Sequence, residues 1–374
     1  MVNHTDPTSN APIMMLSAGK GFIMQSEKYS RDNTGQSLKK YILLKKGELA
    51  YNHGASKAKQ YGCCYELTED EARIPYVYHC FKVSGTEHTP YVATALNNPK
   101  MDRQLKRLVS SSVRMDGLLN ISFDDYMSVI LHLPSLKEQT HIAVFLKKLD
   151  ERITAQEKLV ESLKKYKRGV MQHIFRQLPS QNGAEWTCVR LGDIFKKVSR
   201  RNTDGGIKNV ITNSAEYGLI PQRDFFDKDI AVDGNTANYY VIETGDFVYN
   251  PRKSNSAPYG PFNRYTLSEQ GIISPLYTCL VLQADISPSY LAWYFKSDAW
   301  YRYIYYNGSQ GVRHDRVSMT DDLLMGIPVR YPSHEKQLLY ADILDVVETR
   351  LQATQKTLDL LSKTRDGYMR QLFI

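Results

Sequence analysis

The sequence contains one unit twice, with corresponding residues 198 positions apart. The plainest match joins residues 133–139, Leu-Pro-Ser-Leu-Lys-Glu-Gln, with residues 331–337, Tyr-Pro-Ser-His-Glu-Lys-Gln. Further matches at the same step join 44–52 with 242–250, and 169–175 with 367–373. Because these matches occur in one order at a constant offset, we expect two copies of one structural unit.

Each copy is expected to consist of a mixed module followed by a long helix. Short runs of tyrosine and β-branched residues, such as 239–242 and 277–282, predict strands, and residues 288–306 predict a helix. The modules are expected at 1–132 and 179–330, and the long helices at 133–178 and 331–374. Leu191-Gly192-Asp193 near the start of the second module has no counterpart in the first, because a position 198 residues earlier would precede Met1. The first module is therefore expected to lack its opening segment.

Both long helices have an apolar seam that advances by alternating steps of four and three residues. The seam comprises Ile142, Leu146, Leu149, Ile153, Val160 and Leu163 in the first helix, and Leu344, Val347, Leu351, Leu358 and Leu361 in the second. This spacing is the a/d pattern of a coiled coil. Polar residues interrupt both seams at equivalent places, Gln156 with Thr354 and Lys167 with Arg365.

The expected fold class is therefore α+β, with two mixed α/β modules separated by two long antiparallel coiled-coil helices. We favour antiparallel over parallel packing because parallel packing would place both modules at one end. A coil that serves only for dimerisation is the alternative. Ser135 and Glu138 predict a capping box at the start of the first helix, whereas the second copy keeps Ser333 but has Lys336 in place of the glutamate.

The amino-acid composition indicates which class of molecule the chain binds. The net charge is +8, and residues 1–180 carry all of it, with 26 basic against 18 acidic side chains. A basic chain with 26 tyrosines suits a polyanion. The five cysteines form no C-x-x-C pair, which argues against a disulfide scaffold or a zinc ribbon. We read no signal sequence and no membrane span, so a cytoplasmic location is expected.

The usual signatures of catalysis are absent. The sequence has no phosphate-binding glycine loop, no H-E-x-x-H and no [NDS]-P-P-[YF]. The acidic pairs Asp124-Asp125 and Asp321-Asp322 could hold a metal, but we interpret them as helix caps. We therefore expect neither an enzyme, a metal site nor a cofactor in this chain.

Polar loops that recur in both copies are the candidate DNA-contacting surfaces. Asparagine suits adenine and arginine suits guanine, and basic or tyrosine side chains can reach phosphates. The alternative is that these are ordinary solvated loops. The candidates are Asn52, Lys57, Lys59, Tyr61 and Arg114 in the first copy, and Asn250, Arg252, Lys253, Asn255, Tyr259, Gln310, Arg313 and His314 in the second.

Residues 133–139, leading into 142–175, resemble the conserved region of type I restriction-modification specificity subunits. Residues 186–195 resemble the opening of a target recognition domain in that family, and residues 307–337 resemble its end. The resemblance implies that 1–132 and 179–330 are target recognition domains and that 133–178 and 331–374 are conserved spacer helices.

For function, the resemblance implies a non-catalytic subunit whose two domains each read one half of a bipartite, asymmetric double-stranded DNA site. The helices would set the spacing and dock two modification (methyltransferase) subunits, which bind S-adenosylmethionine. A restriction (motor-nuclease) subunit that uses ATP and Mg would complete the complex. One alternative is a stand-alone sequence-specific DNA-binding regulator that dimerises through its coiled coil. Another is a nuclease or methyltransferase with an unrecognised site.

Overall fold

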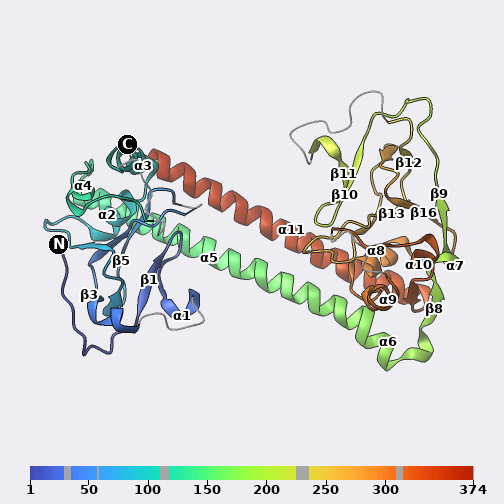
Figure 1. Cartoon of the computed structure of the whole chain (residues 1–374), viewed down its shortest axis with the longest axis horizontal. Coiled ribbons are helices and arrows are strands. Elements are labelled where there is room, and N and C mark those ends of the chain that lie inside the picture. The colour runs from blue at the N-terminus through green and yellow to red at the C-terminus, as the bar shows by residue number, and fades with distance from the viewer. Residues whose placement is uncertain (29–34, 57–58, 110–117, 225–235, 309–314, 374) are drawn as a thin grey trace. The chain divides into compact units, whose positions relative to one another are not determined.

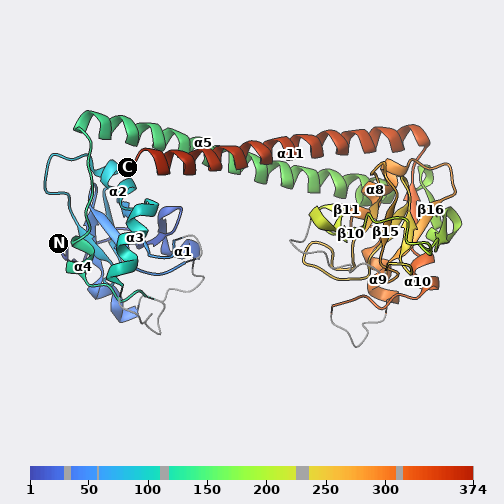
Figure 2. The same cartoon turned by 90° about the horizontal axis from the view of Figure 1, so that it is seen from above.

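The computed structural model describes residues 1–28, 35–56, 59–109, 118–224, 236–308 and 315–373 (Figure 1). The chain forms two compact units. Unit 1 comprises Met1–Lys158 and Lys356–Ile374, and unit 2 comprises Leu159–Gln355. Each unit combines a mixed α/β module with part of both long helices, and in each the helix pair lies along one side of the module (Figure 2).

The elements of the first copy begin with a hairpin and end with a long helix. They are β1 (Met14–Ser17), β2 (Gly21–Met24), α1 (Gln25–Lys28), β3 (Ile42–Lys45), β4 (Leu49–Asn52), β5 (Cys63–Glu66), β6 (Glu71–Ile74), β7 (His79–Phe81), α2 (Thr89–Ala95), α3 (Pro99–Leu108), α4 (Phe123–Met127) and α5 (Leu136–Gln172).

The second copy opens with additional elements and then repeats the same order. Its elements are α6 (Leu178–Gln181), β8 (Thr187–Arg190), α7 (Leu191–Ile194), β9 (Phe195–Val198), β10 (Ile211–Ser214), β11 (Gly218–Pro221), β12 (Tyr240–Ile242), β13 (Phe247–Tyr249), β14 (Phe262–Arg264), β15 (Gly271–Ile273), β16 (Thr278–Leu282), α8 (Pro288–Lys296), α9 (Tyr301–Asn307), α10 (Asp321–Met325), β17 (Pro328–Tyr331) and α11 (His334–Gln371).

Strand pairing follows one plan in both modules. Unit 1 has the hairpin β1–β2, the pair β3–β6 and the sheet β5-β4-β7. Unit 2 has the hairpin β10–β11, the pair β12–β15 and the sheet β14-β13-β16, which β9 extends. The repeat in the sequence is therefore a repeat of topology, and the α+β class is confirmed. The single helix expected at 288–306 is wrong: it is two helices, because Ser297 ends α8 in an extended conformation.

The two copies differ where the second has its opening segment. In unit 2, β9 pairs with β16, and the Val241 N–H donates to the Arg200 carbonyl over 2.7 Å. In unit 1 the Leu43 N–H donates to the His4 carbonyl over 2.8 Å, and the Val2 N–H donates to Cys80. Residues 2–4 thus lie where 198–200 lie in unit 2. No described residue of unit 1 takes the places of β8 and α7.

Aromatic side chains dominate the core of each module. In unit 1, Tyr51 stacks on Tyr126 with ring centroids 3.8 Å apart, and both side chains are buried. In unit 2, Phe262 stacks on Phe295 at 4.0 Å, beside the fully buried Trp300. Large flat side chains supply much buried apolar area per residue, so a small module can hold its loops firmly.

The helices α5 and α11 are antiparallel in both units. In unit 1, Phe145 packs on Tyr368 with ring centroids 4.9 Å apart, and Arg365 Nε binds Asp150 Oδ1 at 2.5 Å. Residue numbers therefore rise along one helix as they fall along the other. In unit 2, Lys167 Nζ lies 2.6 Å from Glu348 Oε2.

The predicted seam residues are buried or half-buried against the partner helix or module. The buried ones are Leu146, Val160, Leu344 and Val347, and the half-buried ones are Ile142, Leu149, Ile153, Leu163, Leu351, Leu358 and Leu361.

A buried glutamine joins each long helix to its module. The Gln337 amide donates to the Pro332 carbonyl over 2.9 Å and accepts the Ser287 N–H, at the start of α8, over 2.8 Å. Gln139 makes the same two bonds in unit 1, to Pro134 and to the His88 N–H at the start of α2. The capping box of Ser135 and Glu138 is confirmed, with Ser135 Oγ 2.7 Å from Glu138 Oε2.

Replacing Gln337 by leucine should destabilise unit 2, because a buried N–H and a buried carbonyl lose their partners. We expect the free energy of unfolding of unit 2, as measured by amide hydrogen exchange in α8, to fall by about 1–3 kcal/mol. Leu339 is an exposed residue of α11, the helix that carries Gln337. Leu339→Ala should change the same free energy by less than about 0.5 kcal/mol. Equal exchange in Gln337→Leu and the native chain would contradict the role given to this glutamine.

Candidate nucleic-acid interface

The polar loop after β13, residues 250–260, is held in one conformation by its own side chains. Asn250 Oδ1 accepts the Arg252 N–H over 3.0 Å, and Tyr249 Oη donates to the Tyr259 carbonyl over 2.8 Å. Gly260 has φ +84°, and a Cβ there would lie 2.0 Å from the Asn250 carbonyl oxygen. The loop is therefore a firm support for whatever its exposed residues contact.

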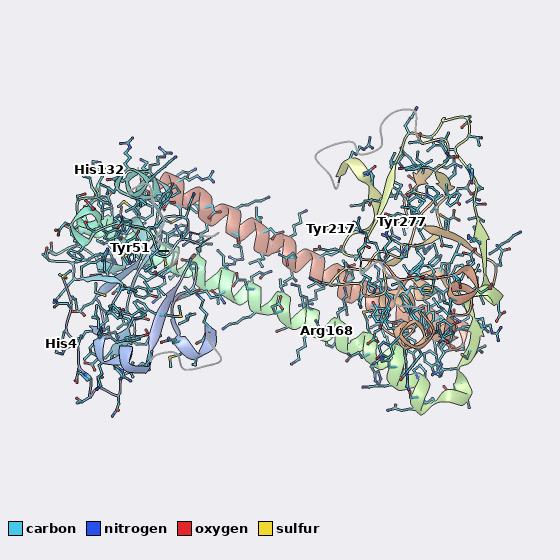
Figure 3. The ribbon with its side chains drawn as sticks, viewed as in Figure 1. His4, Tyr51, His132, Arg168, Tyr217 and Tyr277 are labelled. Carbon is cyan, nitrogen blue, oxygen red and sulfur yellow. The ribbon has the colours of Figure 1, made fainter. Side chains whose placement is uncertain are left out.

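The equivalent loop of unit 1 uses the same bonds. Asn52 Oδ1 accepts the Gly54 N–H over 2.9 Å, and Tyr51 Oη donates to the Tyr61 carbonyl over 2.6 Å. Gly62 has φ +83° and also approaches the preceding asparagine carbonyl. Figure 3 places Tyr51 within the module. The likeness between the copies thus extends to individual hydrogen bonds.

Two of the predicted DNA contacts have other roles in the structure. Asn250 is only 6% exposed, and its Nδ2 donates to the Asn213 carbonyl over 3.2 Å while its Oδ1 holds the turn. Its amide is therefore not free to read a base. Lys59 is half-buried, and its Nζ is bound to the Asn97 carbonyl. The polar sequence suggested exposure, but the polar atoms are used inside the module.

Other candidates stay on the surface. Arg252 and Asn255 are exposed, whereas Lys253 and Tyr259 are half-buried. Tyr259 packs against Tyr301 with ring centroids 5.0 Å apart. Asn52 and Tyr61 are half-buried. Lys57, Arg114, Gln310, Arg313 and His314 lie outside the described residues.

The two candidate loops of each unit meet at their bases. In unit 2 the Val317 N–H donates to the Pro251 carbonyl over 2.9 Å, and the Lys253 N–H donates to Asp315 over the same distance. In unit 1 the equivalent Leu119 N–H donates to the His53 carbonyl over 2.9 Å. In unit 2, residues 315–317, which follow the candidate segment 309–314, thus bond to the start of the loop after β13. In unit 1, residues 118–119, which follow 110–117, bond to the equivalent loop after β4.

Arg252 is well placed to meet an anion. Its side chain is 69% exposed, and its Nε is 4.0 Å from Asp315 Oδ2. An exposed ion pair of this length contributes little free energy, so the guanidinium can exchange the carboxylate for a phosphate.

Sequence reasoning missed a basic helix beside these loops. Helix α3 buries Met101 and Leu105 and exposes its basic side chains, which are Lys100, Arg103, Lys106 and Arg107. The counterpart α9 exposes Tyr305 and Tyr306, and Arg302 lies 5.5 Å from the Tyr306 ring. The helical spacing of basic residues in 99–108 is the signal that could have identified this surface.

A second basic cluster lies in unit 2, around a pocket of about 380 Å³. Lys164, Lys167, Arg168 and Lys296 line it. Figure 3 labels Arg168 on α5. The ammonium groups of Lys167 and Lys296 lie 5.6 and 4.7 Å from the centroid of the Trp293 ring. Burial lowers the pKa of Lys296.

The described residues offer little for covalent chemistry. Burial raises the pKa of Cys63 to about 11 and those of Cys80 and Cys279 to about 12, so these thiols stay protonated at neutral pH. The pair Asp124-Asp125 begins α4, where Asp125 and Ser122 form a capping box. Thr320 caps α10 just before Asp321.

Within the described ranges no group of three or more histidine, cysteine or acidic residues could hold a metal, and no helix is long and apolar enough to cross a membrane.

No protein-family model and no curated protein matches the sequence. Solved structures do match its fold. A chain described in work on complex assembly and conformational transition of the type I R-M system is 16% identical, with a TM-score of 0.53 over 100% of this chain and 94% of that one. The type I restriction-modification system S subunit from M. genitalium is 15% identical, with a TM-score of 0.55 over 99% and 90%. This chain has the fold of those subunits over its whole length.

The contrast between Asn250 and Arg252 can be tested directly. Asn250→Ala should lower the melting temperature, because it removes buried hydrogen bonds that contribute about 1–3 kcal/mol. Arg252→Ala should leave the melting temperature unchanged and weaken duplex binding, and should reduce the slope of log affinity against log salt by about one. Fluorescence anisotropy at several salt concentrations measures the slope. A stable Asn250→Ala chain with altered base preference would restore the base-reading role of Asn250.

Proposed function

We propose that this chain is the DNA specificity subunit of a type I restriction-modification complex. The observation that carries the proposal is the duplicated module on antiparallel helices, combined with a fold shared with S subunits over the whole chain. Each module reads one half of a bipartite, asymmetric site through its paired loops and the basic or aromatic helix beside them. The chain itself catalyses nothing.

The helices α5 and α11 set the spacing between the half-sites. Each is continuous, with 37 and 38 residues, and contributes residues to both units. At 1.5 Å per residue such a helix is about 55 Å long, which suits half-site centres about one turn of DNA, roughly 34 Å, apart. The same helices dock two methyltransferase subunits that bind S-adenosylmethionine. A restriction subunit with ATP and Mg completes the complex.

The stand-alone regulator is less well supported. A regulator that dimerises through its coil needs a seam that is open to a second chain. Here the seam residues Leu146 and Leu344 are 2% and 0% exposed, packed within their own units. Co-purification with a methyltransferase subunit distinguishes the two functions.

Arg252→Ala and Lys253→Ala should weaken contact at one half-site only. Both residues belong to unit 2, so footprinting on a two-half target should show loss of protection over that half and unchanged protection over the other. Asp315→Ala, which frees Arg252 from its carboxylate, should leave both footprints in place. Equal loss over both halves would show that the modules do not read independently.

Lengthening both helices by one heptad should change the preferred gap and leave both half-sequences unchanged. Duplicating residues 152–158 and 350–356, equivalent at the 198-residue step, keeps both seams in phase. Seven residues add about 10 Å, or about three base pairs of DNA. Selection from a library of duplexes with varied gaps measures the change. Single-helix insertions, which put the seams out of register, serve as the misfolded control, and an unchanged gap in the double insertion would refute the ruler role.

A further inference from the structure

Two arginines of unit 2 lie directly opposite each other where its two candidate loops meet. Arg252 and Arg316 form an isolated antiparallel bridge. The two backbone hydrogen bonds that hold the bridge run between the residues on either side of this arginine pair, at 2.9 Å each. The arginines are therefore a non-hydrogen-bonded pair, the kind in which opposite side chains approach most closely. Both side chains leave the bridge on the same face.

This pairing of like charges costs stability unless an anion lies beside it, since like charges directly opposite each other on a ladder are destabilising. Among the described residues, one carboxylate lies within 4.0 Å of the two guanidinium groups. Asp315 Oδ2 is 4.0 Å from Arg252 Nε and 3.7 Å from Arg316 Nε. Both distances are longer than a hydrogen bond. A single exposed carboxylate thus neutralises the arginine pair incompletely.

The position of Asp315 indicates what kind of anion fits. Both guanidinium groups lie near the same oxygen, Oδ2, so an anionic oxygen at this place meets both arginines at once. A phosphate has the required charge, and its several oxygens suit the forked donors of two guanidinium groups. A guanine base, in contrast, presents one O6 and N7 edge to one arginine. The convergence of two arginines therefore favours a phosphate over a base.

Tyr277, labelled in Figure 3, lies beside the arginine pair. Its side chain is half-buried, and burial raises its pKa. The positive charges of Arg252 and Arg316 oppose that rise, so both guanidinium groups lie near the phenol. At neutral pH the phenol keeps its proton and can donate a hydrogen bond to an anion that the arginines hold.

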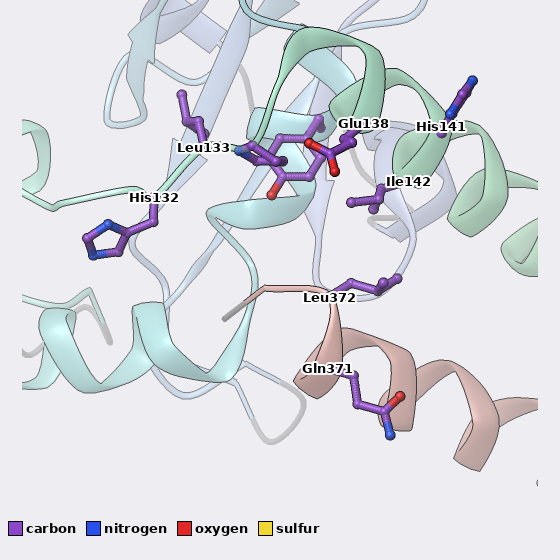
Figure 4. A pocket seen from close by; sticks show the side chains of 9 residues that line it. His132, Leu133, Glu138, His141, Ile142, Gln371 and Leu372 are labelled. Carbon is purple, nitrogen blue, oxygen red and sulfur yellow. The ribbon is translucent and has the colours of Figure 1, made fainter.

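Unit 1 has the same bridge without the charges. Gly54 lies opposite Leu118 in an isolated antiparallel bridge, and these two residues are the counterparts of Arg252 and Arg316 at the 198-residue step. A pocket of about 490 Å³ in unit 1 offers no substitute, because its lining residues include Glu138 and, all being described, contain no lysine or arginine (Figure 4). In the described part of the chain, the arginine pair thus belongs to the loop junction of unit 2 alone.

We propose that Arg252 and Arg316 together bind one backbone phosphate of the half-site that unit 2 reads. In the free chain the Asp315 carboxylate occupies the place of that phosphate, and it moves aside when DNA binds. This inference rests on the proposed function and adds Arg316 to the residues that contact DNA. Because both arginines hold the same phosphate, they act as one contact, and that contact carries no base preference.

Arg316→Leu is the first test, with the two-half duplex recovered from the gap library as the probe and fluorescence anisotropy as the measurement. Leucine is the residue that unit 1 has in the same bridge, so the variant should fold. Its affinity should fall about tenfold, because a charge-assisted hydrogen bond is lost. Its melting temperature should equal or exceed that of the native chain, because charge repulsion is relieved. Arg330→Leu, at an exposed position of β17 outside the bridge, is the matched control and should weaken binding less than about threefold.

The slope of log affinity against log salt counts the phosphates that the chain neutralises. In the double variant Arg252→Ala/Arg316→Leu the slope should fall by about one, no more than in Arg252→Ala alone. A fall of about two would mean two separate phosphates and overturns the proposal. Asp315→Asn, which leaves both arginines in place, should strengthen binding about threefold in the native chain and have no effect in the double variant. Unchanged or weaker binding in Asp315→Asn overturns the proposal as well.

The outcomes separate this inference from the proposed function. A native chain that binds no duplex overturns both. A native chain that binds its duplex, with Arg316→Leu equal to it in affinity and salt slope, overturns the inference alone. A change in the bases selected by Arg316→Leu, in place of a uniform loss over all sequences, would make Arg316 a base reader and also overturns the shared phosphate contact.

Discussion

The structure depends on the charged pair that each unit places in its helix seam. Asp150 with Arg365 and Lys167 with Glu348 are one interaction seen twice, because the 198-residue step converts Asp150 to Glu348 and Lys167 to Arg365. The step therefore exchanges the two helices, as antiparallel packing of a duplicated chain requires. Such half-buried pairs contribute little net free energy, but a shifted register would leave partly desolvated charges without their partners. The pairs select one register rather than supply most of the stability.

The charge state of these pairs links the register to pH. Burial alone raises the pKa of Glu348, but the hydrogen bond from Lys167 leaves that pKa below its ordinary value. A depressed carboxyl pKa contributes stability that is present above the unfolded-state pKa and is lost as the pH falls through the folded-state pKa. At neutral pH Glu348 is therefore charged and paired with Lys167. The apolar seam residues then supply the buried area, and the charged pairs fix which residues of the two helices face each other.

Much of this arrangement could be predicted from the sequence, because it depends on local and periodic signals. The seam follows a 3.5-residue period, and the Ser135 cap follows a four-residue motif. The break at Ser297 and the burial of Asn250 could not be predicted, since both depend on tertiary partners, the Tyr294 carbonyl and Asn213. The polar composition of residues 250–260 predicts an exposed loop, but Asn250 is buried and its side chain holds the turn. The basic face of α3 could be predicted, because the basic residues of 99–108 recur at helical spacing around the buried Met101 and Leu105.

A duplicated scaffold can read an asymmetric target only if its copies differ where they are exposed. The hydrogen bonds that shape the loops are the same in both units, from Asn52 and Asn250 to Tyr51 and Tyr249. The residues carried on that shared frame differ: Arg252 and Lys253 of unit 2 correspond to Gly54 and Ala55 of unit 1. The same division holds at the module edge, where Lys336 faces Glu185 but its counterpart is Glu138. The residues that shape the loops are alike in both copies, because replacing one of them leaves a buried polar group without a hydrogen-bond partner. Exposed residues can differ between the copies at little cost in stability, and they can therefore carry the specificity.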